Sequence, residues 1–220
     1  MDLRKEYDIK ALAEQLRLPN GELGIKVGEN MNKGNRLMNL ETISQLGLND
    51  NDNVLEIGMG NGFFVKDILA AGKNVKYSGC DFSETMVKEA LVLNGSFASN
   101  AQFILSNADE LPFKDGSFDK VFTVNTIYFW ENAQRTLAEI RRVLKGDGIL
   151  IVTMRPKTIM DKLPVVKYGF TTFSTEDAVT LLEENKFEII SATESPDTDI
   201  TINEQTFKNS FVIIKAIQTK

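Results

Sequence analysis

The sequence contains no histidine and only one cysteine, Cys80, among its 220 residues. A single cysteine cannot form an internal disulfide, and without histidine the usual zinc ligand sets are missing, so we expect no metal site. Histidine is also the side chain that most often moves protons near neutral pH. Any proton transfer must therefore use a carboxylate, lysine, tyrosine, the thiol, water or the substrate itself.

Long apolar runs are absent too: none approaches the roughly 20 residues that a membrane-spanning helix needs. The first ten residues are too polar for a secretory signal, so we expect a cytoplasmic protein. The net charge of −6 disfavours binding to nucleic acid, whose polyphosphate backbone requires clustered lysine and arginine. The basic stretch 135–145 has the spacing of a solvated helix face. These features favour a small-molecule substrate.

Apolar stretches alternate with stretches of helical character, the pattern of βαβ units. Residues 194–209 are polar and show no convincing helix, so the two strands that flank them are expected to pair antiparallel. We predict a single α/β domain over residues 1–220, a Rossmann-like three-layer sandwich whose seven-stranded sheet is mostly parallel, with an antiparallel last strand. The expected strands are 53–57, 75–80, 101–105, 120–124, 148–153, 187–193 and 210–218, and the expected helices are 3–16, 33–46, 62–71, 83–93, 132–143 and 175–185.

The stretch 54–64, VLEIGMGNGFF, is an apolar strand that runs into a glycine-rich turn and then a helix. Its alternate glycines permit positive φ and let the backbone approach a ligand closely. The amides at the start of the following helix suit a carboxylate or a phosphate. A nicotinamide or flavin dinucleotide would require glycine at the sixth position of the turn, where this chain has Phe63, so that interpretation is disfavoured.

Polar residues follow the next two predicted strands. Asp81 ends the second strand, roughly 20 residues beyond the glycines, where a carboxylate can accept both hydroxyls of a ribose. Asn107 follows the third strand, where its amide and the neighbouring backbone can bond to the edge of an adenine. Because parallel strands end at one edge of a sheet, these residues predict a nucleoside site there.

Together these motifs resemble the class I S-adenosylmethionine-dependent methyltransferases, and within them the group of ubiquinone and menaquinone biosynthesis C-methyltransferases. Residues 144–150, LKGDGIL, look like the family's turn into the fifth strand, and Phe118 and Asp119 precede the fourth strand as in the family. The resemblance implies an S-adenosylmethionine cofactor and methyl transfer to a small-molecule acceptor by in-line displacement. The residues that it places at the cofactor are Glu56, Gly58, Gly60, Asn61, Asp81, Phe82, Asn107, Ala108 and Asn125.

The stretch after the fourth strand, 124–130 (VNTIYFW), lacks the two prolines that amino-directed methyltransferases of nucleic acids often carry there. Phe129 is interpreted as a core residue, whereas Tyr128 and Trp130 fit the core and a ligand contact equally well. A sulfonium is already activated, so the enzyme mainly has to align the acceptor and exclude water. If the acceptor must lose a proton, Tyr128, Asp109 and other carboxylates are the candidates.

Two segments are expected to close the site. Residues 1–46 form a helical segment that either caps the cofactor or simply covers the sheet, and residues 155–173 are an insertion that forms a wall of the acceptor pocket. The alternatives to a methyltransferase are a non-catalytic regulatory module that binds S-adenosylmethionine and, less favoured, a dinucleotide-dependent oxidoreductase. The same fold methylates carbon, nitrogen and oxygen, so the acceptor atom and the oligomeric state stay open at this point.

Overall fold

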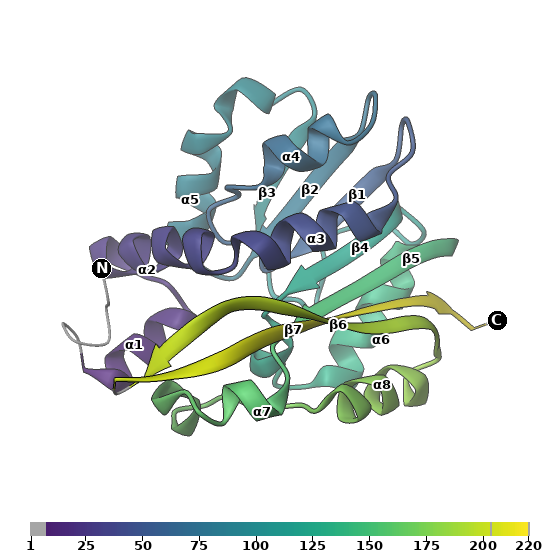
Figure 1. Cartoon of the computed structure of the whole chain (residues 1–220). Coiled ribbons are helices and arrows are strands. Elements are labelled where there is room, and N and C mark those ends of the chain that lie inside the picture. Colours follow the sequence, from purple (N-terminus) through teal and green to yellow (C-terminus); the bar gives the residue numbers. More distant parts are fainter. Residues whose placement is uncertain (1–7, 203, 220) are drawn as a thin grey trace.

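The computed structural model describes residues 8–202 and 204–219, and a seven-stranded β-sheet lies at its centre (Figure 1). The strand order across the sheet is β3-β2-β1-β4-β5-β7-β6. The first five strands pair in parallel, and β7 is antiparallel to both β5 and β6. The predicted sheet is therefore confirmed. Its strands are β1 (Asn53–Ile57), β2 (Lys76–Asp81), β3 (Ala101–Leu105), β4 (Phe118–Val124), β5 (Leu144–Met154), β6 (Phe187–Ile202) and β7 (Gln205–Gln218).

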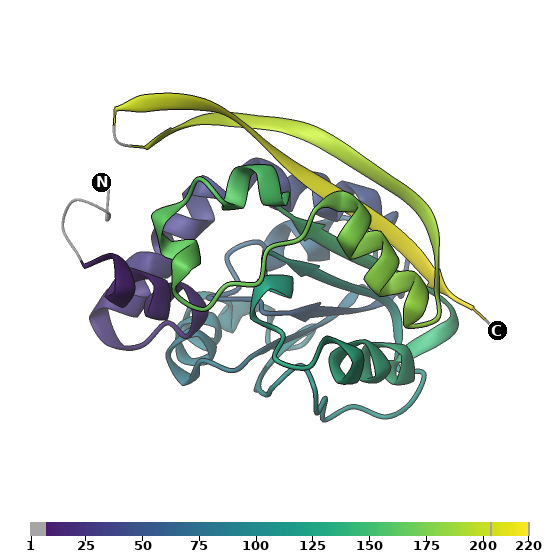
Figure 2. The same ribbon diagram turned by 90° about the horizontal axis from the view of Figure 1, so that it is seen from below.

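Helices cover both faces of the sheet and complete the predicted three-layer sandwich (Figures 1 and 2). On one face Met38 and Ile68 pack on Phe122, and on the other Leu137 and Leu182 pack on the opposite side of the strands. The central strands are buried on both faces, which explains their almost continuous apolar sequences. The helices are α1 (Ile9–Arg17), α2 (Gly21–Gly34), α3 (Arg36–Leu46), α4 (Val65–Ala70), α5 (Glu84–Leu93), α6 (Ala133–Val143), α7 (Lys157–Met160) and α8 (Thr175–Glu184).

Side-chain caps stabilise the starts of two helices. The Ser83 hydroxyl accepts a hydrogen bond from the Met86 amide at the start of α5. Ser174 and Asp177 form a reciprocal capping box at the start of α8, in which each side chain accepts from the other residue's amide. In the part of the chain that the structure describes, no helix has the length and apolar character needed to cross a membrane.

The N-terminal segment differs from the expectation. The predicted helix 3–16 is found as α1, and residues 3–7 of that prediction lie outside the described residues. Helix α2 is not among the expected helices. A Cβ atom on Gly24 would lie 2.6 Å from the Pro19 carbonyl carbon, so the missing side chain lets α2 pack closely against the residues that precede it. The predicted helix 33–46 is shortened to α3.

The C-terminal strands are longer than predicted. Residues 194–209, expected to contain no regular element, form the outer half of a β6–β7 hairpin. Strand β7 pairs with β5 only from Val212 to Ile217, so the outer half of the hairpin runs past the end of β5, toward the side where α1 lies (Figures 1 and 2). Two smaller corrections concern helices: α4 begins at Val65 rather than at residue 62, and the 155–173 insertion contains α7 and the short 3₁₀ helix η4 (Pro164–Lys167).

Replacing Leu137 with alanine should lower the free energy of unfolding by about 2–5 kcal/mol, because the side chain is fully buried between α6 and the sheet. The matched control is Leu91→Ala in α5, where the leucine is 53% exposed and a change of about 0.5 kcal/mol or less is expected. Urea unfolding followed by circular dichroism measures both. Equal losses in the two variants would contradict this description of the core.

Candidate functional site

A cavity of about 940 Å³ opens at the carboxyl ends of β1, β2, β3 and β4. This is the edge at which ligands bind in open α/β sheets, and the strand order reverses there between β1 and β4. Every cofactor-binding residue and both proton acceptors named from the sequence line this one cavity. They are Glu56, Gly58, Gly60, Asn61, Asp81, Phe82, Asn107, Ala108, Asp109, Asn125 and Tyr128.

The glycine turn forms the floor of the cavity. The Gly58 and Met59 amides donate to the Cys80 carbonyl at 2.8 and 3.2 Å, which ties the turn to the end of β2. Gly58 has a φ of +73°, and a Cβ atom there would overlap the Thr126 methyl group. Gly60 has a φ of +55°, but a Cβ atom on it would meet no atom within 4 Å. The turn is therefore packed on one side and open on the other.

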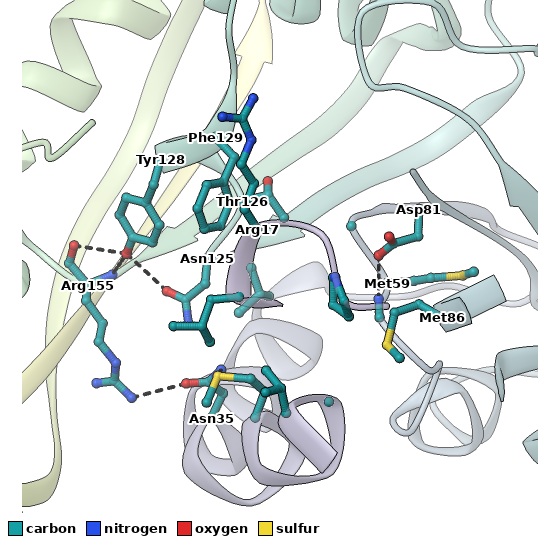
Figure 3. A pocket seen from close by; sticks show the side chains of 18 of the residues that line it. Arg17, Asn35, Met59, Asp81, Met86, Asn125, Thr126, Tyr128, Phe129 and Arg155 are labelled. Atoms are coloured by element: carbon teal, nitrogen blue, oxygen red, sulfur yellow. Dashed lines mark hydrogen bonds between the residues drawn. The ribbon is translucent and has the colours of Figure 1, made fainter. Parts of the chain in front are cut away.

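Asp81, at the end of the adjacent strand β2, stabilises the glycine turn. Its carboxylate accepts a hydrogen bond from the Gly60 amide (Figure 3) and another from the Ser83 amide, both at 2.9 Å. The residue is only 8% exposed, and burial raises the pKa of its carboxyl group from 3.8 to about 6. The two amide hydrogen bonds oppose this shift, because they stabilise the charged form. Asp81 thus lies in the cavity wall as a buried, partly satisfied acid.

Glu56, at the end of β1, is a second buried acid. It accepts a hydrogen bond of 2.6 Å from the Tyr77 hydroxyl. Burial raises the pKa of Glu56 from 4.5 to about 8, with a smaller contribution from the negative charge of Asp81, while the Tyr77 bond lowers it. In the free protein Glu56 is therefore mostly protonated at neutral pH. A cation or a hydrogen-bond donor bound beside it would stabilise its ionised form.

The other predicted cofactor residues come from neighbouring strand ends. Phe82, directly after Asp81, is 44% exposed, which leaves its ring free for contact with a flat ligand. Asn107 and Ala108 follow β3 in the loop after Ser106, whose amide donates to the Asp81 carbonyl at 3.0 Å. In Asn61 the buried side-chain oxygen has no hydrogen-bond partner among the described residues. A buried acceptor without a partner in a cavity wall can be satisfied by a hydrogen-bond donor of a bound ligand.

Asn125, Tyr128 and Arg155 form a network at the end of β4 (Figure 3). Asn125 has a φ of +58°, and its side-chain oxygen lies 3.0 Å from the Tyr128 hydroxyl. That hydroxyl accepts from the Arg155 amide at 2.5 Å and lies 3.1 Å from the Arg155 carbonyl oxygen. Burial raises the pKa of the Tyr128 hydroxyl above its ordinary value. Strained backbone of this kind gathers at functional sites.

The far side of the cavity is built by segments on both sides of the motif region. Leu12 and Leu16 come from α1, Val27 from α2, and Met160 from α7. Residues of the segments 8–46 and 155–173 therefore both line the cavity. That the N-terminal segment caps the cofactor stays a prediction. Sequence reasoning missed the contribution of the hairpin, from which Thr198, Asp199, Ile200, Thr201 and Asn209 line the cavity. The β-branched residues in this stretch were the available signal.

Substituting Glu56 with glutamine should flatten the pH dependence of stability. Between pH 4.5 and 8 the folded protein holds a proton on Glu56 that the unfolded chain has released, so the free energy of unfolding falls as the pH rises through this window. Glutamine can still accept the Tyr77 hydrogen bond but does not titrate. Thermal unfolding of both proteins across this range measures the difference, and the exposed Glu84→Gln is the control. If stability fell with pH equally in wild type and Glu56→Gln, the raised pKa of Glu56 would be contradicted.

Comparison with known proteins agrees with this geometry. A family model described as a methyltransferase domain matches residues 55–152. The uncharacterized methyltransferase YdaC of Bacillus subtilis is 32% identical over 123 residues, which are 56% of this chain and 67% of that protein, so the match spans about two thirds of that relative's length.

Two solved structures share the fold. The chain that forms a complex with the Haloferax volcanii Trm112 methyltransferase activator superimposes with a TM-score of 0.78 at 18% identity, covering 88% of this chain and 93% of that one. A SAM-dependent methyltransferase from Methanosarcina mazei gives a TM-score of 0.65 at 21% identity, covering 81% and 98%. With this sheet, this glycine turn and these relatives, the chain belongs to the class I S-adenosylmethionine-dependent methyltransferases.

Proposed function

We propose that this protein transfers a methyl group from S-adenosylmethionine to a small molecule bound in the same cavity. The observation that carries the proposal is Asp81, a buried carboxylate fixed between the glycine turn and the start of α5 in the cavity wall. The oxidoreductase alternative loses its support, because the sixth position of the turn is Phe63, which packs edge-on against Phe64. The finer resemblance to the ubiquinone and menaquinone C-methyltransferases stays a prediction.

The residues around the turn fit an S-adenosylmethionine molecule. Asp81 would accept hydrogen bonds from the ribose hydroxyls, and Phe82, Asn107 and Ala108 would contact the adenine. The open space at Gly60 admits the ligand close to the backbone. The orphan oxygen of Asn61 would receive a donor from the amino-acid part. Glu56 and Asn125 would complete the site on the side of β4.

When bound, S-adenosylmethionine supplies a methyl group on an electron-poor sulfonium, which an aligned nucleophile can displace without metal or redox chemistry. The chain's own contribution is to orient the acceptor and exclude water. Tyr128 keeps its proton, because burial raises its pKa, so we assign it to positioning Asn125 and Arg155. Asp109, whose carboxylate lies 4.0 Å from the Arg135 guanidinium, is then the remaining named candidate for accepting a proton.

Changing Asp81 to asparagine should weaken S-adenosylmethionine binding at least about tenfold, since it removes the charge that strengthens the ribose hydrogen bonds. Isothermal titration calorimetry gives the dissociation constant directly. The control is Asp147→Asn, an exposed aspartate outside the cavity, which should bind like the wild type. Unchanged affinity in a folded Asp81→Asn protein would refute the proposed cofactor site.

Cofactor affinity should also depend on pH. The Asp81 carboxyl has a pKa of about 6 in the free protein, and ribose hydroxyls donate to the ionised form, so binding releases a proton around this pH. The association constant should fall as the pH drops through about 6, by up to about tenfold per pH unit. Titrations in two buffers with different ionisation enthalpies count the released protons. The expected slope is lost in Asp81→Asn, and a wild-type affinity that does not vary with pH would contradict the assignment.

A further inference from the structure

The cavity continues beyond the residues assigned to the cofactor, into what we call the outer compartment. Its walls come from α1, α2, the stretch after β4, the α7–η4 segment and the β6–β7 hairpin. Apolar side chains of α1, the stretch after β4 and the α7–η4 segment form much of this wall, and the Phe129 and Phe170 rings contact each other at a centroid distance of 4.6 Å. The α2 side and the hairpin add mainly asparagine and threonine side chains. The apolar lining also includes Leu16 of α1, Val27 of α2, Val165 of η4 and Ile200 of the hairpin.

The charged side chains of the outer compartment are already paired. The basic residues among the described cavity lining are Arg17, which forms an ion pair with Glu131, and Arg155. The Arg155 guanidinium lies 2.8 Å from the Asp197 carboxylate, and the two side chains are only 12% and 4% exposed. Neither arginine is available to an anionic ligand without breaking a pair, and for the buried pair this is strongly unfavourable.

The acidic side chains of the lining add to this effect. Asp109 lies near Arg135, and Asp199 pairs with Lys208 at 3.0 Å. Asp81 lines the same cavity and loses its proton above its pKa of about 6. A negatively charged acceptor would therefore enter a cavity that offers it no free cation among the described residues. A neutral apolar molecule would instead gain from the burial of its surface.

The β6–β7 hairpin adds a wall to the cavity beyond the carboxyl edge of the sheet. Its outer half has no strand on the side of β5, and Arg155 holds it there by hydrogen bonds to Asn209 at 2.8 Å and to the Ser210 carbonyl at 3.4 Å, in addition to the Asp197 pair. The same guanidinium contacts the α2–α3 junction at Asn35, 3.3 Å away (Figure 3). Ile200 lies on the hairpin that Arg155 holds, and it lines the cavity.

We infer that the acceptor is an uncharged, largely apolar molecule of aromatic or comparable ring size, and that Ile200 on the hairpin helps to select it. This inference rests on the proposed function and adds the substrate class. The apolar side chains in the wall and the absence of an unpaired cation among the described lining residues together disfavour carboxylated or phosphorylated acceptors.

The test uses two probes with the same arylamine skeleton, neutral N-phenyl-1-naphthylamine and its anionic sulfonate, 1-anilinonaphthalene-8-sulfonate. Binding is followed by fluorescence, with and without saturating S-adenosylhomocysteine, on the full chain. The neutral probe should bind at least about tenfold more tightly than the sulfonate. The Ile200→Asp variant should weaken the neutral probe at least about tenfold while binding S-adenosylhomocysteine normally by calorimetry.

Ile190→Asp is the matched control, because Ile190 lies on the same strand, is exposed and does not line the cavity. It should leave both probes unaffected. Equal or tighter binding of the sulfonate, or an Ile200→Asp protein with unchanged affinity for the neutral probe, would overturn the inference. Failure of the wild type to bind S-adenosylhomocysteine would instead overturn the proposed function, and the probe comparison without that nucleoside still decides the question of acceptor class.

Discussion

Two carboxyl groups buried at neighbouring strand ends are the constraint on which the site depends. Glu56 and Asp81 end β1 and β2, the two adjacent parallel strands, and little water reaches either of them. Burial of a charge is costly unless it is paired or hydrogen-bonded, so Glu56 stays mostly protonated at neutral pH, and two backbone amides offset only part of this cost for the ionised Asp81. A ligand with hydroxyl donors and a positive centre would satisfy the remainder, so the unfavourable free state favours binding.

The backbone beside Glu56 and Asp81 adopts uncommon conformations that pack against each other. Gly58 must adopt positive φ against Thr126, and Asn125 adopts positive φ on the neighbouring strand end. The Thr123 hydroxyl, which donates to the Ile57 carbonyl at 2.8 Å and contacts the Thr126 hydroxyl, links the two bends. The strain in one bend is therefore supported by the other. This arrangement keeps the floor of the cavity fixed before any ligand binds, which reduces the ordering cost of binding.

The residues that the sequence assigns to the cofactor lie in one cavity because their sequence signals are local. A strand, a glycine turn and an acid at the next strand end follow one another within about 30 residues, as in the βαβ unit. The outer half depends on contacts between distant residues, such as Arg155 with Asp197 and Asn35. Residues 194–209 look polar because the outer hairpin faces solvent, and α2 looks irregular because of its packing glycines. Neither feature has a short-range signature that separates it from a loop.

Arg155 connects the two halves mechanically. Its backbone amide and carbonyl hold the Tyr128 hydroxyl, which contacts Asn125 at the end of β4, while its guanidinium holds the hairpin at the outer compartment. A buried ion pair of this kind adds little net stability relative to an apolar replacement, yet losing one partner leaves an uncompensated charge. Its value is therefore geometric. Because the outer half of the hairpin extends past the last pairing of β7 with β5, its position beside the cavity depends on Arg155 and on the contact of the Lys162 ammonium with the Phe207 ring.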